Sequence, residues 1–573
     1  MPDRRTILKT LAAAGIGTPV FHRAAASLIQ EKQELSRETL QQASWIADFD
    51  LADEDADKIL ASVKRNVRAM KILRKSRLDA SEAPAFIFQT LSKKPAGIEP
   101  RRDAKPRVND ETNLPDSDEA IAFLPVAQLA SLIRAKKLTS ASLTKIYLER
   151  LKRFGAMLRC VVNLTEDLAN AQAEAADKEI SNGNYRGPLH GIPWGAKDLM
   201  DVPGYPTTWG IPHYKERMSE EAATIYQRLT DAGAVLVAKL SLGALAMGDK
   251  WFGGLTRNPW NPKTGSSGSS AGSASATVAG LVGFSIGTET LGSIVSPSKV
   301  CGANGFRPTF GRVSRHGCMP LSWTMDKAGP ICRSVEDCAL VFDAIHGADG
   351  KDRATRSTAF QWPPAVDMNS IKVGYPKGLD VEDRVELKTL QELGCEMVPV
   401  EIPTPFPLRP LASIIDVEGA SVFDSLLRDG HTDGWNTWPN SFRSIQYMSA
   451  VDYLRMMRLR TRIMESFEQF IGQVDVLCNM FDIFHTNLTG HPSVVVPQSY
   501  KDLDGGGKKP TTVTFTGHLD EDAKLLAVAD SFQRQIKIND RPELEAWLKR
   551  FEDGSLDKSN NPDDEEDESA KDD

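Results

Sequence analysis

The segment between Gly265 and Ser298 constrains the fold of this chain more than any other. It contains Gly-Ser-Ser-Gly-Ser-Ser-Ala-Gly-Ser, then a short apolar stretch, and then Gly-Thr-Glu-Thr-Leu-Gly-Ser-Ile. We expect a helix of small residues over 273–279 and a short buried strand over 281–286. Gly- and Ser-rich runs are usually flexible linkers. Here Trp260-Asn-Pro precedes the run and an apolar helix follows it, so a loop in the protein core is the better interpretation.

A lysine upstream of this segment has the chemistry needed to activate a serine. Serine is a poor nucleophile unless a neighbour removes its proton, and an uncharged lysine amine can do so. Lys197 lies in Gly-Ile-Pro-Trp-Gly-Ala-Lys-Asp, with Leu and Met following shortly after. A lysine is charged at its usual pKa of about 10.4, and burial among apolar residues lowers that pKa. The alternative is a surface lysine that pairs with Asp198.

Two other functional patterns compete for the serine-rich loop. A phosphate-binding P-loop is poorly supported, because no Gly-Lys-Ser/Thr follows. The pattern Gly-x-Ser-x-Gly occurs twice, centred on Ser270 and Ser285, and marks the nucleophile of α/β-hydrolases. Such a serine should directly follow a buried strand. Ser270 instead follows turn-forming residues and Ser285 lies inside an apolar run, which disfavours this interpretation.

Several separate blocks, in the same order, resemble the amidase signature family. The resemblance extends over about Ile121 to Gln535. The blocks are Pro188-Leu-His-Gly-Ile-Pro-Trp-Gly-Ala-Lys197-Asp, Gly268-Ser-Ser-Ala-Gly, Gly287-Thr-Glu-Thr-Leu-Gly-Ser293-Ile, Cys301-Gly-Ala-Asn-Gly-Phe-Arg-Pro-Thr, Met325-Asp-Lys-Ala-Gly-Pro and Asn487-Leu-Thr-Gly-His-Pro.

The resemblance implies a Ser-cisSer-Lys triad. The nucleophile falls on Ser293, the bridging serine on Ser269, 24 residues earlier, and the base on Lys197. The family's bridging serine follows a cis peptide bond, which would join Gly268 to Ser269.

The resemblance also implies an oxyanion site in the turn before the nucleophile, formed by backbone N–H groups of Thr290, Leu291 and Gly292. Two positions depart from the family pattern. Leu291 stands where a glycine is common, which restricts φ and adds bulk near the acyl pocket. Val295 stands where many members have arginine. Because neither change removes a triad residue, we expect activity with an altered substrate preference.

The function implied by this resemblance is an amidohydrolase that cleaves a carboxamide through an acyl-enzyme on Ser293, with esters left open as further substrates. Its partner would be a small-molecule amide, with no cofactor and no metal; a homodimer is implied by resemblance only. Pocket walls are expected from residues 205–260 and 405–485. Two alternatives stay open. One is a glutaminase of the kind that serves a glutamyl-tRNA(Gln) amidotransferase as its A subunit, and the other is a non-catalytic binding protein that keeps the fold.

Composition bounds the partners of the chain. The formal net charge is −8, but residues 552–573 alone carry eleven acids and two lysines, so the remainder is close to neutral. We therefore expect no nucleic-acid partner. The seven cysteines form no Cys-x-x-Cys pair and the nine histidines are scattered, which disfavours a zinc site. Residues 551–573 are expected to be a disordered acidic tail.

The N-terminus resembles a twin-arginine signal. Arg4 and Arg5 precede an apolar run over 11–21, and Ala24-Ala-Ala follows. The run is too short for a stable membrane span. We therefore predict a signal peptide over 1–26 and export, with a periplasmic location; the alternative is an amphipathic helix on a cytoplasmic protein.

The remaining chain divides into two parts. Residues 27–117 are predicted to form a helical N-terminal extension and linker. Its apolar positions Val63, Val67, Met70 and Leu73 have helical spacing in an otherwise basic helix.

Residues 118–550 are predicted to form an α/β amidase signature domain, a large mixed β-sheet core flanked on both faces by helices. A helix capped by Ser140 and a long helix over 451–471 are further expectations.

Overall fold

A computed structural model describes residues 35–44, 51–76, 86, 104–107, 113–403, 408–480, 483–538 and 540–556. The predicted signal over 1–26 and most of the predicted tail over 551–573 lie outside the described residues. No helix in the described part is both long enough and apolar enough to cross a membrane.

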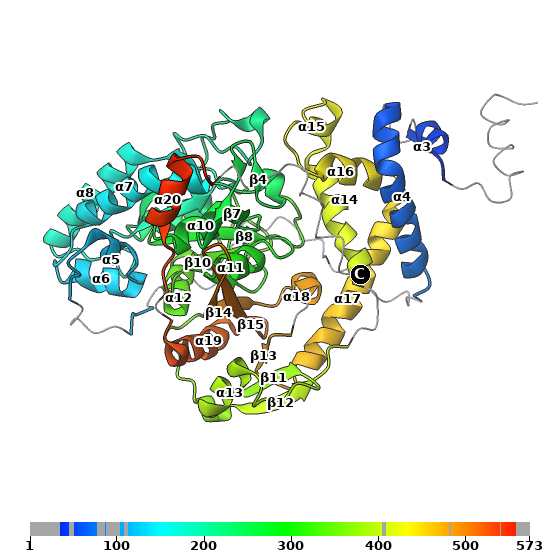
Figure 1. The fold of residues 1–573 in the computed structure, drawn as a ribbon. Coiled ribbons are helices and arrows are strands. Elements are labelled where there is room, and N and C mark those ends of the chain that lie inside the picture. Colours follow the sequence, from blue (N-terminus) through cyan, green and yellow to red (C-terminus); the bar gives the residue numbers. More distant parts are fainter. Residues whose placement is uncertain are drawn as a thin grey trace, which may run out of the picture.

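The centre of the molecule is an 11-stranded mixed sheet (Figure 1). Its strands are β1 (Val161–Leu164), β2 (Pro193–Lys197), β3 (Val235–Leu240), β8 (Phe284–Glu289), β9 (Asn304–Arg307), β10 (Lys327–Cys332), β11 (Lys372–Pro376), β12 (Glu396–Val400), β13 (Val476–Cys478), β14 (Ser493–Asp502) and β15 (Lys508–Gly517). Their order in the sheet is β1-β3-β2-β8-β10-β9-β14-β15-β13-β11-β12. Two small two-stranded sheets pair β4 (Lys250–Trp251) with β5 (Gly254–Leu255) and β6 (Arg257–Asn258) with β7 (Asn261–Gly265).

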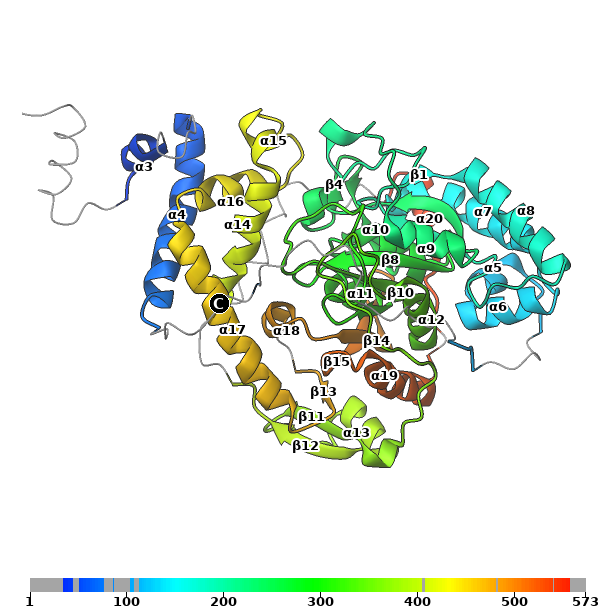
Figure 2. The ribbon, with the colours of Figure 1, turned by 180° about the vertical axis from the view of Figure 1, so that it is seen from behind.

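Helices flank this sheet or pack on one another at one end of the molecule. They are α3 (Arg37–Ser44), α4 (Asp53–Leu73), α5 (Asp118–Ala122), α6 (Val126–Arg134), α7 (Ser140–Leu158), α8 (Glu166–Ser181), α9 (Thr224–Asp231), α10 (Ala271–Val278), α11 (Val295–Cys301), α12 (Val335–Ile345), α13 (Val385–Glu392), α14 (Ser413–Val422), α15 (Asp424–Arg428), α16 (Trp438–Ile445), α17 (Ala450–Ile471), α18 (Ile483–Thr489), α19 (Asp522–Ile536) and α20 (Leu544–Glu552). Figures 1 and 2 place α5 to α8 at one end of the molecule. At the other end α4 lies beside α14, α16 and α17, and we name these last three helices the helical end.

The strand arrangement brings the two expected catalytic segments to one edge. β2 and β8 are parallel neighbours, with Trp194 opposite Phe284 and Ala196 opposite Ile286. Lys197 ends β2, and β8 runs into the turn that carries Ser293. Since parallel strands end at the same edge, both segments emerge together, as in other α/β sheets that bind ligands beyond the carboxyl ends of their strands.

Most elements expected from the sequence are present, with shifted ends. The small-residue helix is α10, and the long helix predicted over 451–471 is α17. The strand expected over 281–286 begins only at Phe284, because residues 281–283 form the turn that leads into β8. The prediction that Ser140 caps α7 was wrong. The cap is Thr139, whose hydroxyl accepts from the N–H of Ser142.

The N-terminal helices α3 and α4 pack against the helical end of the molecule. Leu40, Ile59 and Val63 form a small apolar cluster with Tyr447 against them. The predicted apolar face of α4 was partly wrong, because Val67 is 41% exposed. Charged contacts fasten this helix pair, since Arg74 pairs with Asp452 and Arg443 lies 3.0 Å from Asp55.

Candidate active site

Lys197 is completely buried at the end of β2. Its Nζ lies 2.9 Å from Ser269 Oγ and 3.0 Å from Ser270 Oγ. It also lies 2.8 Å from the hydroxyl and 3.3 Å from the carbonyl oxygen of Thr288 on β8. The amine therefore sits in a cage of oxygen atoms drawn from the serine-rich loop and the neighbouring strand.

The serine-rich loop approaches β8 closely because Gly287 of β8 has no side chain. A Cβ placed on Gly287 would lie 2.7 Å from Ser270 Oγ, so no larger residue fits there without a shift. The peptide bond between Gly268 and Ser269 is cis, at the position that the resemblance implied. The N–H of Ser270 donates to the Ser293 carbonyl at 3.1 Å, which joins this loop to the turn carrying Ser293.

The two adjacent serines differ in the hydrogen bonds open to them. Ser270 Oγ donates to the Thr288 carbonyl at 3.0 Å and accepts from the Thr288 N–H at 3.1 Å. Its only proton is therefore committed to a group that can only accept. Ser269 Oγ has Lys197 as its hydrogen-bond partner. Of the two, Ser269 is the one whose proton is available to the amine.

Burial lowers the pKa of Lys197 to about 7, although the carboxylates of Asp326 and Glu289 oppose this shift. The amine is therefore uncharged in a large fraction of molecules at neutral pH. The alternative pairing with Asp198 is contradicted by the structure. The Asp198 carboxylate lies 2.9 Å from Lys239 Nζ, and both side chains are fully buried.

Ser293 follows β8 in a tight turn and is 8% exposed. No hydrogen bond joins its hydroxyl to Ser269 or Lys197 among the described residues, so the contact between Ser293 and the loop is the backbone bond described above. Gly292 has a φ of +88°, which favours glycine, whereas Leu291 is not among the residues with positive φ. Leucine is thus compatible with this turn, and its side chain packs partly buried against the main core.

A buried carboxylate fixes the backbone just after Ser293. Glu289 accepts from the N–H groups of Ile294 and Val295 at 2.8 and 2.9 Å. The same carboxylate lies 2.5 Å from Arg307 of β9 and accepts from the Asn487 amide at 2.8 Å. The cation beside this turn is therefore Arg307, because Val295 carries no charge.

The charge of Glu289 is retained despite its burial. Desolvation alone would raise its pKa, but the cations of Arg307 and Lys327 and the hydrogen bond from Val295 hold the pKa at about 2. The carboxylate is therefore ionised throughout the range in which enzymes ordinarily work.

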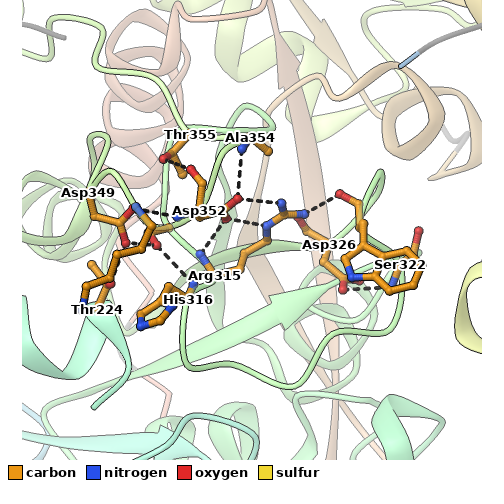
Figure 3. Close-up of polar contacts among 12 residues, drawn as sticks. Thr224, Arg315, His316, Ser322, Asp326, Asp349, Asp352, Ala354 and Thr355 are labelled. Carbon is orange, nitrogen blue, oxygen red and sulfur yellow. Dashed lines mark hydrogen bonds and ion pairs between the residues drawn. The ribbon is translucent and has the colours of Figure 1, made fainter. Parts of the chain in front are cut away.

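A second buried carboxylate holds the other side of the turn. Asp326 accepts from the Thr290 hydroxyl at 2.5 Å and from the N–H groups of Leu321 and Ser322 at 2.8 and 2.9 Å. Figure 3 shows Arg315 beside it. Arg315 donates to the Asp326 carbonyl at 3.2 Å and forms a two-point contact with Asp352 at 2.8 and 3.0 Å.

A cavity of about 160 Å³ opens beside Thr288 and Thr290; we name it the Trp323 cavity. The cavity lies close to Lys197, because Thr288 lines the cavity and its hydroxyl also accepts a hydrogen bond from the Lys197 amine. Of the ranges 205–260 and 405–485, which were expected to supply pocket walls, Ala246 lines this cavity. The residues lining it are Leu199, Ala246, Thr288, Thr290, Arg315, His316, Cys318, Met319, Pro320, Leu321, Trp323, Asp326, Lys327, Lys351 and Asp352.

Sequence reasoning assigned no role to several residues that hold this site. Arg307, Asp326 and Asn487 lie inside the blocks that carry the family resemblance, and that placement was the available signal. Thr288 and Ser270 lie beside residues that were singled out. Their contacts depend on which strands become neighbours, and the sequence does not give that order.

Comparisons with known proteins show the family of this chain. A model of the Amidase family matches residues 142–480. The A subunit of glutamyl-tRNA(Gln) amidotransferase from Chloroflexus aurantiacus is 30% identical over 485 residues, which cover 74% of this chain and 98% of that protein. The putative amidase AmiD of Mycobacterium tuberculosis is 39% identical over 236 residues, which cover 41% of this chain and 50% of that protein.

Among solved structures, the peptide amidase from Stenotrophomonas maltophilia has a TM-score of 0.65 and 27% sequence identity to this chain. The match covers 74% of this chain and 99% of that protein.

Proposed function

This chain belongs to the amidase family and is a hydrolase of amide bonds, and from that premise we propose that it forms an acyl-enzyme on Ser293, with Ser269 as proton relay and Lys197 as base. The observation that carries this proposal is the buried amine of Lys197 2.9 Å from Ser269 Oγ. Burial lowers the pKa of this lysine to about 7, so a lone pair is available to take a proton.

In the proposed first step, Ser293 Oγ attacks the amide carbonyl carbon. Its proton passes to Ser269 Oγ while Ser269 gives its own proton to Lys197 Nζ. The same path in reverse then protonates the leaving nitrogen, and the C–N bond breaks to release an amine or ammonia. A water molecule attacks the ester on Ser293 by the same route, which frees the carboxylic acid and restores the neutral amine.

The negative charge that develops on the carbonyl oxygen needs hydrogen-bond donors. We propose that backbone N–H groups of Thr290, Leu291 and Gly292 supply them. This turn is held by Asp326 on one side and Glu289 on the other. Donors fixed before the reaction are effective because they need not reorganise, and removing one typically costs about 100- to 1,000-fold in rate.

A panel of primary and secondary amides and a few esters tests this function, with Ser293→Ala and Lys197→Ala as paired variants. We expect the unmodified enzyme to hydrolyse at least one amide and both variants to lose that activity with unchanged thermal unfolding. Amide hydrolysis at the normal rate by Ser293→Ala would refute the assignment.

A second candidate function is glutamine hydrolysis for a tRNA-dependent amidotransferase. It is supported by the similarity to the A subunits of such amidotransferases over nearly their full length. Glutaminase activity that rises on addition of a tRNA-binding partner, together with co-purification of that partner, would support this candidate over a free-standing amidase.

We also propose that the protein is exported by the twin-arginine route, as the order of Arg4, Arg5, the apolar run and the alanines indicates. Cell fractionation of the full chain and an Arg4→Lys/Arg5→Lys variant tests this. Export of the parent chain and cytoplasmic retention of the variant are expected, whereas equal distribution of both would reject a signal.

A further inference from the structure

The Trp323 cavity has the size of one small ring. Its volume is about 160 Å³, close to the roughly 150 Å³ of an apolar protein cavity that binds benzene. Thr288 and Thr290 line it, the first in contact with the lysine and the second in the turn of the proposed site. A group bound here would therefore lie beside the turn that carries Ser293.

Apolar side chains such as Leu199, Met319 and Trp323 are available to contact an occupant, and several polar groups beside them already have partners. At its base Asp326 already accepts three hydrogen bonds, and Thr288 Oγ1 is bonded to Lys197. Lys327 Nζ donates to the Met325 carbonyl. None of the lining residues, all of which are described, has a buried side-chain polar atom without a partner. A polar group placed against the apolar side chains would lose its water without gaining a new partner, and this costs free energy.

The wall that carries Trp323 is held in place from the helical end of the molecule. Glu418 of α14 accepts from the Ser322 hydroxyl at 2.7 Å and from the Thr324 hydroxyl at 2.8 Å. Arg460 of α17 donates to the Thr324 carbonyl at 2.8 Å. Such a wall keeps its shape, so an occupant is selected by size.

Arg315 holds the same wall from the opposite side. It donates to the Trp323 carbonyl at 2.7 Å while its guanidinium is anchored on Asp352 (Figure 3). The Trp323 residue itself is 50% exposed. A half-exposed indole that lines a cavity is suited to pack against a flat apolar group.

We propose that the Trp323 cavity binds one uncharged, ring-sized apolar group of the substrate, so that amides bearing a phenyl or similarly sized branched group are preferred to acetamide. This inference rests on the proposed function. The inference adds a specificity pocket to that function. Its determinants are Trp323 and the other side chains that line the cavity, Cys318 among them.

Two matched substrate pairs test the preference. Phenylacetamide against acetamide varies the acyl side, and N-benzylacetamide against N-methylacetamide varies the amine side. A hydrophobic pocket discriminates even one methylene by roughly 10-fold or more, so we expect at least a 10-fold higher kcat/KM for the ring-bearing member of one pair. Ratios near one in both pairs would overturn the proposal.

Variants then locate the preference. Trp323→Ala removes the mouth of the cavity and Cys318→Phe fills it, and either is expected to reduce the ring preference about 10-fold. Val385→Ala, at an exposed apolar residue on α13, is the control and should leave the ratio unchanged. If both cavity variants fold, as judged by thermal unfolding, and keep the full preference, the proposal is wrong.

Direct binding separates this inference from the proposed function. Ser293→Ala is titrated with phenylacetamide and with acetamide by calorimetry. At least 10-fold tighter binding of phenylacetamide supports the cavity assignment even if the unmodified enzyme hydrolyses neither compound, an outcome that would count against the proposed function alone. Equal affinities would reject the cavity assignment.

Discussion

At the scale of single residues, proton accounting around Lys197 distinguishes two adjacent serines. A neutral amine has one lone pair, which needs a hydroxyl that can donate. Ser270 has committed its proton to the Thr288 carbonyl, whereas Ser269 has not. The assignment of Ser269 as relay, which the family resemblance implied, therefore gains an independent physical argument.

This argument predicts different consequences for two neighbouring substitutions. Ser269→Ala removes the relay and should lower kcat by about 100- to 10,000-fold, the range typical of general acid–base groups. Ser270→Ala removes one contact to Lys197 but leaves the relay, so its loss should be at least 10-fold smaller. Steady-state kinetics on the preferred amide measures both. A larger loss in Ser270→Ala would mean that the relay is assigned to the wrong serine.

How far single residues could be predicted depended on the kind of information. The family resemblance proposed Lys197, Ser269 and Ser293 as site residues, and the apolar neighbours of Lys197 predicted the burial that the structure shows. The partner of Asp198 could not be predicted, because Lys239 comes from a different strand, 41 positions further along the chain. Pairings between distant segments depend on strand order, which local patterns do not contain.

At the scale of elements, the turn after β8 is held by the buried ion pair of Glu289 and Arg307 rather than by contacts within the turn. Glu289 is bonded to two N–H groups of the turn, and Arg307 on β9 neutralises it. The two strands are not neighbours, since β10 lies between them. The sequence shows that Val295 departs from the family pattern. Only the fold shows that Arg307 pairs with the carboxylate that holds this turn.

Removing one partner of this pair should be costly. Arg307→Met leaves Glu289 charged, buried and without its ion-pair partner, a change that typically costs about 3–5 kcal/mol of unfolding free energy. The double variant Glu289→Gln/Arg307→Met removes both charges and should recover part of that loss. Denaturant unfolding at pH 7 measures both. Equal stability of the parent and Arg307→Met would contradict the account.

The same pair predicts a pH dependence of stability. The pKa of Glu289 is lowered in the folded protein to about 2 from 4.5. Its contribution is therefore complete above pH 4.5 and is lost as pH falls toward 2. The parent protein should lose more stability across this window than the double variant. Parallel curves for the two proteins would show that Glu289 is not the group responsible.

At the scale of the whole molecule, the helical end contributes to the site without lining it. Glu418 and Arg460 hold the wall of the Trp323 cavity, while α4 packs on the outer side of the same helical end. Periodicity predicted α4 and the long helix α17, but nothing in the sequence placed them side by side.

The peripheral cluster under α3 and α4 should be separable from the catalytic core. Ile59 is fully buried there, and Ile59→Ala should cost about 2–5 kcal/mol locally. Hydrogen exchange in residues 51–76 should increase, while exchange in β2 and β8 and amide hydrolysis stay unchanged. A matched substitution at the exposed position, Val67→Ala, should have little effect. Loss of activity in Ile59→Ala would show that the helix pair supports the site directly.

The most direct test of the central claim measures how fast a fluorophosphonate modifies the enzyme as a function of pH, with the site of attachment mapped by mass spectrometry. A neutral Lys197 acting through Ser269 predicts an adduct on Ser293 whose rate of formation rises with pH and is half-maximal near pH 7, where burial places the pKa of the lysine. Lys197→Ala should react slowly and without that step. An adduct on another serine, or the same pH dependence in Lys197→Ala, would contradict the account.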